Sequence, residues 1–149
     1  KYNIYIDTYS QTLNEKGLEV SKLFKKGTLV ITIAANIGDV GILNFDTCFP
    51  DSLVGITPID KNKTDILFIL FFFKTYKKIL DNIASKSTQK NINLELLNNI
   101  EIILPEINQQ KKIASILSKN LKIIHYYNNK LHKIQSMKKF YIKEIFKNG

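Results

Sequence analysis

The stretch of the sequence after Pro105 has a helical pattern of apolar residues and contains no further proline, and no glycine before Gly149. Proline and glycine are the residues that most often end helices, so this stretch predicts one helix of about 40 residues. At 1.5 Å per residue such a helix is about 60 Å long, and a domain of about 100 residues, with a radius of gyration of about 13 Å, cannot cover all of it. Part of its surface therefore needs another segment, from this polypeptide or from a second copy.

Apolar residues recur along the predicted helix at the spacing of a heptad repeat. The two heptad rows are mostly apolar or aromatic, although Asn120 and Lys138 interrupt them. This pattern predicts a helix that packs along one or two partners, but it is too irregular for a regular two-stranded zipper. The residues predicted to mediate helix pairing are Ile113, Leu117, Leu121, Ile124, Leu131, Ile134, Tyr141 and Ile145.

The residues up to Pro105 have the pattern of a mixed globular domain. β-branched and apolar runs predict buried strands, and Thr64 or Asp65 can cap a long apolar helix. The predicted strands are Asn3–Asp7, Thr28–Ala35, Val40–Phe45, Ser52–Thr57 and Ile100–Leu104, and the predicted helices are Leu18–Phe24, Ile66–Ala84 and a single turn capped by Asn93. Strands and helices alternate without a regular βαβ rhythm, which predicts an α+β domain with a mixed or antiparallel sheet. We therefore expect a domain over residues 1–105, closed by Ile100–Leu104, and a long C-terminal helix over 106–149.

The excess of positive over negative charge lies entirely on the predicted long helix. Residues 1–106 carry 12 Lys and 12 Asp plus Glu, whereas residues 107–149 carry 10 Lys and one Glu. A run of lysines can be a solvated face, a surface for DNA phosphates or a docking surface for an acidic protein. Composition alone does not separate these three interpretations.

Patterns for catalysis and metal binding are missing from the sequence. It contains neither the GxxxxGK phosphate loop nor the GxGxxG dinucleotide turn. His125 and His132 share a helix face but lack the further ligands of a zinc site, and Cys48 has no neighbouring base. We therefore predict no catalytic residue, no metal site and no cofactor.

The cellular compartment is predicted from what the sequence lacks. It shows no signal peptide, and its longest apolar run, Ile66–Phe73, is far shorter than the roughly 20 residues that span a bilayer. A single cysteine favours a reducing compartment. The expected location is the cytoplasm, without membrane contact.

A short polar segment, Ser85–Asn93, is the best candidate for a binding loop. It is either an ordinary surface loop or a loop that reads a DNA groove, since Asn and Gln can pair with adenine and Lys with guanine acceptors. The turn at Asn36 is the next candidate. If these segments read DNA, the residues expected to contact it are Lys86, Thr88, Gln89, Lys90, Asn91 and Asn36.

Four stretches resemble the specificity subunit of type I restriction-modification systems. They are Gly27–Gly41 (GTLVITIAANIGDVG), Ser52–Pro58 (SLVGITP), Ser87–Asn93 (STQKNIN) and Ile102–Leu117, and their order and separation match the end of a target recognition domain and its following conserved helix. The last stretch keeps the spacing of the family's E-Q-x-x-I-A-x-x-L helix start at Gln109, Gln110, Ile113, Ala114 and Leu117. Two departures are Lys86, where the family has glycine, and Gln109, where it has glutamate. The first part of a typical recognition domain is missing, so the chain is expected to be a fragment.

The resemblance implies a function without chemistry of its own. A full specificity subunit would read a bipartite DNA sequence with two recognition domains, and two long helices would pair as an antiparallel coiled coil that sets their spacing. Methyltransferase subunits, which hold the cofactor and the catalytic residues, would dock on these helices, and the restriction translocase subunit would join them. The implied partners of this chain are therefore double-stranded DNA, both subunit types, and a second recognition half or second copy.

Two other interpretations stay open at this point. The chain can be a protein-interaction module without DNA contact, such as a solitary half-subunit. It can also be the recognition part of a single-chain restriction-methylation enzyme.

Overall fold

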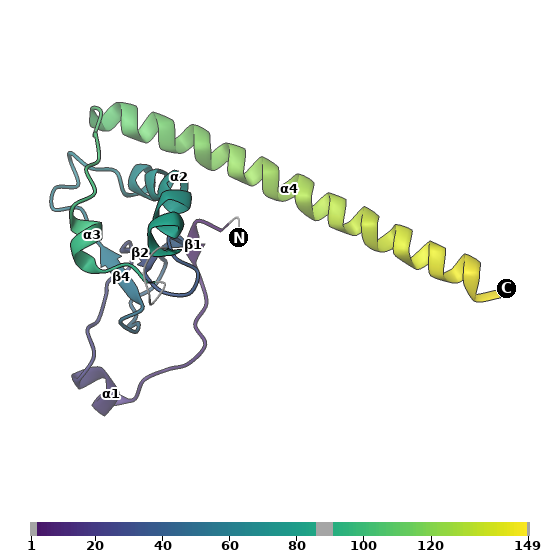
Figure 1. The fold of residues 1–149 in the computed structure, drawn as a ribbon, viewed down its shortest axis with the longest axis horizontal. Coiled ribbons are helices and arrows are strands. Elements are labelled where there is room, and N and C mark those ends of the chain that lie inside the picture. Colours follow the sequence, from purple (N-terminus) through teal and green to yellow (C-terminus); the bar gives the residue numbers. More distant parts are fainter. Residues whose placement is uncertain (1–2, 86–90, 149) are drawn as a thin grey trace. The chain divides into compact units, whose positions relative to one another are not determined.

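The computed structural model describes residues 3–85 and 91–148, which form a small mixed sheet, three short or medium helices and one long helix (Figure 1). The strands are β1 (Tyr5–Ile6), β2 (Leu29–Thr32), β3 (Val40–Leu43) and β4 (Leu53–Ile56), and the helices are α1 (Glu15–Glu19), α2 (Ile66–Ser85), α3 (Leu94–Asn98) and α4 (Ile107–Ile145), with a 3-10 turn at Phe146–Asn148. The described chain divides into two compact units, Asn3–Ala114 and the residues from Ser115 onward.

The sheet has the strand order β1-β3-β2-β4. β2 pairs antiparallel with both β3 and β4, in a register that sets Leu29 opposite Ile42 and Ile56, whereas β1 pairs parallel with β3. The sequence predicts one strand over Thr28–Ala35, and the β-branched residues of this run do form the central strand, because both faces of β2 are buried. The predicted α+β class with a mixed sheet is confirmed.

The core lies between the sheet and α2, whose apolar first half is buried against the strands. Leu29 and Ile31 of β2 and Leu70 and Leu80 of α2 are fully buried. Asp65 begins this helix, since its Oδ1 accepts a hydrogen bond from the Phe68 backbone N–H at 2.9 Å. Of the two predicted caps, Asp65 is therefore the one that the structure uses.

Two predicted elements are wrong. Leu18–Phe24 is not a helix: the helix is α1, capped by Asn14, and it lies at the far end of a long excursion from the sheet (Figure 1). Phe24 instead pairs with Thr47 in an isolated bridge, because its ring stacks on Phe49 at a centroid distance of 3.9 Å.

The run Ile100–Leu104 is not a strand and does not close the sheet. A strand of this length needs a partner edge and a buried face, yet no ladder joins these residues to β1 or β4, and the Ile103 side chain is 92 % exposed. The segment is an irregular connection from α3 to α4. The turn capped by Asn93 is confirmed as α3, where Asn93 Oδ1 accepts from the Leu96 N–H at 2.9 Å.

The start of α4 belongs to the globular unit, where Gln110 and Ala114 are buried. Gln110 is fully buried, and its Oε1 accepts a hydrogen bond from the Asp65 N–H at 2.9 Å. Its Nε2 donates to the carbonyl oxygens of Lys63 at 2.8 Å and Pro105 at 2.7 Å. One amide therefore joins the N-terminus of α2, the loop before it and the N-terminus of α4.

Candidate nucleic-acid interface

The connection between β2 and β3 is a tightly closed turn that presents Asn36. The Thr32 backbone N–H donates to the Asp39 carbonyl at 2.9 Å, and the Gly38 N–H donates to the Thr32 carbonyl at 2.9 Å. Inside the turn the Thr32 hydroxyl donates to the Asn36 carbonyl and accepts from the Asp39 N–H. Ile37 is buried and anchors the turn, whereas Ala35, with a φ of 57°, and Asn36 are exposed. Hydrogen bonds thus fix the backbone of the turn, and the Asn36 side chain is exposed to solvent.

The same turn is held against α2. Gly38 has a φ of 77°, and a Cβ at this position would lie 3.2 Å from the Lys77 Cα, so glycine is needed both for the conformation and for the close approach. The neighbouring Asp39 carboxylate forms an ion pair with Lys77. Both side chains are about half exposed, and such a pair orients the turn more than it stabilises the fold.

The middle of α2 brings a second lysine to this turn. Lys74 lies three residues before Lys77 on the helix and interacts with the Asp39 carboxylate. Burial lowers the pKa of Lys74, since the interior disfavours its charged form, while the nearby Asp39 carboxylate acts in the opposite direction. Asp39 therefore interacts with two lysines of α2, Lys74 and Lys77.

The end of the polar loop lies beside the turn. The Ile92 N–H donates to the Ile33 carbonyl at 3.0 Å, and Ile92 is buried. This hydrogen bond places Asn91, which is exposed, close to the turn that carries Asn36, although the two are 55 residues apart in the sequence. The other four predicted DNA-binding residues, Lys86, Thr88, Gln89 and Lys90, lie outside the described residues.

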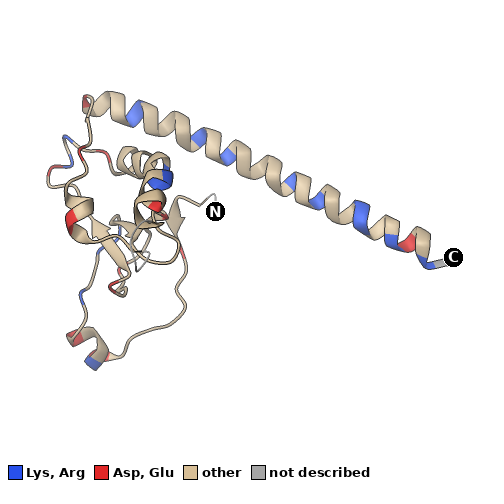
Figure 2. Cartoon of the chain, in the orientation of Figure 1, with Lys and Arg blue, Asp and Glu red and all other residues tan. Residues whose placement is uncertain are grey.

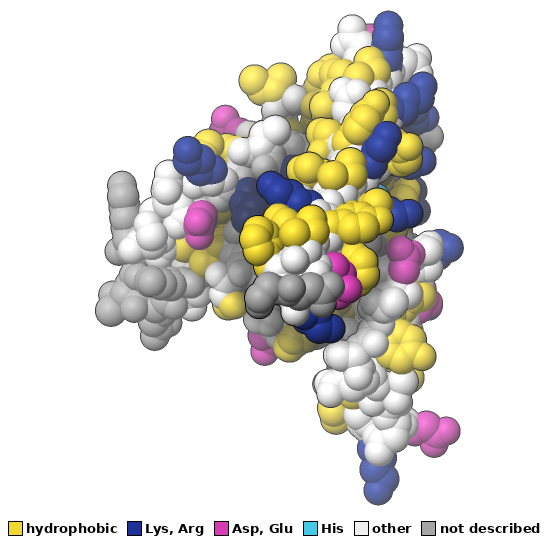
Figure 3. All heavy atoms as spheres, turned by 90° about the vertical axis from the view of Figure 1, so that its right-hand side faces the viewer, with side chains coloured by type: hydrophobic (Ala, Val, Ile, Leu, Met, Phe, Trp, Pro, Cys, Tyr) yellow, Lys and Arg dark blue, Asp and Glu magenta, His cyan; other side chains and the backbone are white. Residues whose placement is uncertain are grey.

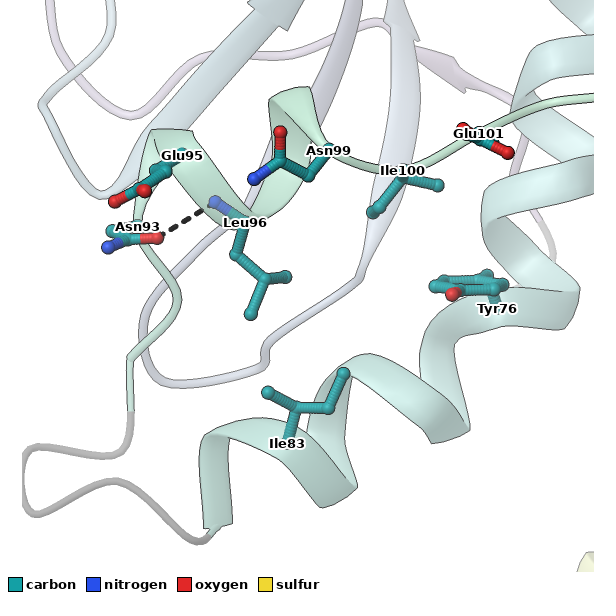
Figure 4. Close-up of a pocket in the computed structure, with 8 residues that line it drawn as sticks. All are labelled: Tyr76, Ile83, Asn93, Glu95, Leu96, Asn99, Ile100 and Glu101. Atoms are coloured by element: carbon teal, nitrogen blue, oxygen red, sulfur yellow. Dashed lines mark hydrogen bonds between the residues drawn. The ribbon is translucent and has the colours of Figure 1, made fainter.

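A cavity of about 650 Å³ lies between the second half of α2 and α3 (Figure 4). Tyr76 and Ile83 line it from α2, and Leu96 and Ile100 line it from α3 and the following segment. Glu95 and Glu101 also belong to its wall. Two carboxylates and no lysine make this cavity unsuitable for a phosphate, so it is not part of the candidate interface.

The predicted helix-pairing residues are largely uncovered in the single chain. Seven of the eight are exposed, from 36 % at Leu117 to 69 % at Ile145, and Leu121 is half-buried. Figure 3 shows hydrophobic side chains gathered in yellow with Lys side chains beside them. An apolar stripe of this length on an exposed helix indicates a partner.

Sequence reasoning missed three residues that shape the candidate interface. Asp39 and Lys77 are ordinary charged residues in the sequence, and only the fold brings them together. In the sequence, Thr32 is one more β-branched residue of a predicted strand. The alternation of apolar residues gives no sign of the hydrogen bonds that its hydroxyl makes inside the turn. The sequence signal for this region is the Gly38–Asp39 pair, which marks the turn itself.

The fold and the turn-and-loop surface define a class: an α+β domain that presents polar side chains from clustered loops and continues into a long helix. The chain belongs to the family of type I restriction modification DNA specificity domains, whose family model matches residues 2–136. Among curated proteins, it is 32% identical over 117 residues to the type I restriction enzyme MjaIX specificity subunit of Methanocaldococcus jannaschii, covering 77% of this chain and 27% of that protein. It is 29% identical over 111 residues to the putative MjaX specificity subunit of the same organism, covering 74% of this chain and 26% of that protein.

Solved structures show the same fold. A chain from a structure describing complex assembly and conformational transition of the type I R-M system matches with a TM-score of 0.62 and 22% identity, over 83% of this chain and 29% of that chain. The HsdS subunit of Thermoanaerobacter tengcongensis matches with a TM-score of 0.56 and 20% identity, over 76% of this chain and 25% of that one. The S subunit of M. genitalium matches with a TM-score of 0.56 and 24% identity, over 82% and 34%.

The chain spans about a quarter of the length of the curated relatives that it matches. Specificity subunits of type I systems are non-catalytic, so the family confirms the expectation that this chain is not itself an enzyme. Within residues 3–85 and 91–148, no helix is both long enough and apolar enough to cross a bilayer.

Proposed function

We propose that this chain reads one half of a bipartite DNA sequence as the recognition part of a type I specificity subunit in the cytoplasm. The observation that carries the proposal is the hydrogen bond between Ile92 and Ile33, which brings the Asn36 turn and the end of the polar loop to one surface. Both Asn36 and Asn91 carry amides that can pair bidentately with adenine in a major groove. The domain would comprise residues 1–105 and the spacer helix residues 106–149.

The neighbouring lysines supply the affinity that base contacts alone do not. Lys77 and Lys74 of α2 both interact with Asp39 of this turn, and the sequence of the polar loop adds Lys86 and Lys90. Contacts to phosphates position a protein on the duplex, whereas contacts to base edges select the sequence. We assign the first role to the lysines and the second to Thr88, Gln89, Asn91 and Asn36.

The long helix would serve assembly. Its apolar stripe from Ile113 to Ile145 pairs with the helix of a second recognition half or of a second copy, and the pair sets the spacing between two half-sites. Methyltransferase subunits dock on this helix pair, and the restriction translocase subunit joins the complex. The chain itself then needs no cofactor, since the chemistry belongs to those subunits.

The test measures DNA binding by the intact specificity subunit with its methyltransferase. Asn36→Ala and Asn91→Ala should each lower affinity for the recognised sequence about 5- to 150-fold, from about 1–3 kcal/mol of discrimination per bidentate contact, and should relax preference at one base pair. Lys86→Ala/Lys90→Ala should weaken binding to all sequences alike. Unchanged affinity and preference in all three variants would refute the assignment of this surface.

Asn62→Ala is the matched control. Asn62 is an exposed loop asparagine near the N-terminus of α2, where its own backbone N–H donates to Asp60 Oδ1 at 2.8 Å. Lys77, which holds the Asn36 turn, lies 12 residues along α2 from Asp65, a distance of about 18 Å at 1.5 Å per residue. This control should bind DNA like the wild type.

A protein-interaction module without DNA contact is the second candidate, favoured by the exposed stripe on α4. Salt dependence separates the two, since a DNA reader loses affinity with a log–log slope of about −0.9 per phosphate contact. The single-chain interpretation requires a methylase domain on the same polypeptide, and sequencing the coding region on both sides of this chain tests that requirement.

A further inference from the structure

The long helix has a second organised face, opposite part of its apolar stripe. Lys119, Tyr126, Lys133 and Phe140 follow one another at intervals of seven residues, which is nearly two helical turns. Each of them lies two residues after a member of the heptad row Leu117, Ile124, Leu131 and Lys138, which is apolar except at Lys138. Two residues rotate an α-helix by about 200°, so the two rows lie on nearly opposite sides of α4. We call Lys119, Lys122, Tyr126, Lys130, Lys133 and Phe140 the lysine face.

The lysine face is exposed and carries no compensating charge. All four of its lysines are exposed, and α4 contains nine lysines but a single acidic residue, Glu144, near its C-terminal end (Figure 2). Within the residues that the structure describes, both ion pairs belong to the globular unit, at Lys25–Asp46 and Lys77–Asp39. The positive charge of this face is therefore available to a partner.

Two aromatic rings in the same row argue against a face that is merely solvated. Tyr126 is 61 % exposed and Phe140 is 60 % exposed. They lie nearly opposite the first row of the stripe, and each ring makes an edge contact with the ring of the next residue, Tyr127 or Tyr141. Exposed rings interleaved with lysines are a surface on which a nucleic acid can be held by both ring and charge contacts.

The chemistry of the face favours a nucleic acid over a protein. Lysine is depleted in the centres of protein–protein interfaces, whereas lysine without neighbouring acid is typical of surfaces that neutralise phosphates. The four lysines span 14 residues, about 21 Å along a straight helix. A DNA duplex offers a negative charge for about every 1.7 Å of its axis and so matches a linear row of this length.

We propose that the lysine face of α4 binds the phosphates of the duplex beside the half-site, without reading its sequence. This inference rests on the proposed DNA-binding function and adds a second contact to it. The stripe residues then face the paired helix while the opposite side of α4 follows the DNA backbone. The helix would thus contribute directly to affinity, independently of the turn and loop that select the sequence.

The experiment replaces Lys119, Lys122, Lys130 and Lys133 by Gln in the intact specificity subunit with its methyltransferase and measures DNA affinity against salt. Each phosphate that the variant no longer neutralises should reduce the log–log salt slope by about 0.9, up to about 3.6 for four phosphates. Between 0.2 M and 0.05 M salt the affinity deficit relative to the wild type should then grow by up to about 150-fold. Preference among sequences should stay as in the wild type.

The control removes the same charge from the globular unit, through Gln replacements of the exposed lysines Lys16, Lys26, Lys61 and Lys63. An equal change of slope in the control, or an unchanged slope in the α4 variant, would overturn the inference. So would loss of methyltransferase association with an unchanged slope, which would identify an acidic protein as the partner.

A second measurement uses the wild type and needs no variant. Neutral methylphosphonate linkages placed in the DNA beside the half-site should reduce the salt slope in the same way, and an unaffected slope would again contradict the proposal. If the wild type shows no sequence-specific binding at all, the proposed function fails, whereas specific binding with an unchanged slope refutes the lysine face alone.

Discussion

Replacing Gln110 by leucine should destabilise the globular unit more than its size suggests. The Gln110 amide makes three hydrogen bonds, to the Asp65 N–H and to the Lys63 and Pro105 carbonyl oxygens, and the residue is fully buried. Each such bond contributes about 0.5–1.5 kcal/mol, and loss of the side chain leaves three backbone groups without their partner. Leucine fills a similar volume, so the apolar gain offsets part of this, and we expect a loss of about 3 kcal/mol.

Thermal and urea unfolding of the chain check this magnitude. For a chain of this size, about 3 kcal/mol corresponds to a fall in Tm of about 6–12 °C. Gln110→Glu should be at least as destabilising at neutral pH, because a carboxylate cannot donate to either carbonyl. Gln109→Leu is the matched control, since Gln109 is exposed and lies one residue away. If Gln110→Leu unfolds at the same temperature as Gln109→Leu, the amide does not hold α4 to α2 and the reasoning is wrong.

The remaining predictions concern one ion pair, the apolar stripe and one carboxylate. Lys77→Met should cost less than about 1 kcal/mol of stability, because its ion pair with Asp39 is half exposed. The same substitution should weaken DNA binding, because it frees the turn that carries Asn36. A double-mutant cycle with Asp39→Asn measures the coupling between Lys77 and Asp39. Ile124→Asp/Leu131→Asp should abolish helix pairing in sedimentation velocity and leave the Tm of the globular unit unchanged, since both residues lie beyond Ala114; a persistent oligomer would contradict the pairing role. The Lys25 ammonium, with the Lys26 N–H, lowers the pKa of Asp46 below its ordinary 3.8. The contribution of the Asp46 carboxylate to the stability of the fold is therefore present above pH 3.8 and is lost as the pH falls through the lowered pKa. Asp46→Asn should accordingly flatten the dependence of stability on pH below about 4, and an unchanged acid profile would show that this pair has no such effect.

The pattern of apolar residues correctly predicted the elements that are recognisable from their own sequence. The β-branched run of β2 and the long apolar run of α2 bury almost continuously, and the stretch without proline or glycine after Pro105 forms α4 as expected. Ile100–Leu104 has the composition of a strand but no partner edge in the sheet, and a partner edge is a tertiary property that composition does not contain. Leu18–Phe24 failed for a related reason, since Phe24 is fixed by Phe49 from another loop.

The candidate interface was only partly visible in the sequence. Polar chemistry on loops identified Asn36 and Asn91 separately, but their proximity depends on one long-range hydrogen bond between Ile92 and Ile33. The family resemblance includes Gln110 in a helix motif without assigning it a role. Its three partners, drawn from the α2 loop and from Pro105, explain why an amide rather than a carboxylate or an apolar side chain is needed there.

Selection from a randomised duplex library by the intact specificity subunit, with its methyltransferase bound, tests the central claim most directly. The account predicts enrichment of one bipartite sequence by the wild type. It predicts that Asn36→Ala/Asn91→Ala loses preference at positions of one half-site and keeps the other half-site unchanged. Failure of the wild type to enrich any sequence, or enrichment of an identical sequence by the double variant, would contradict it.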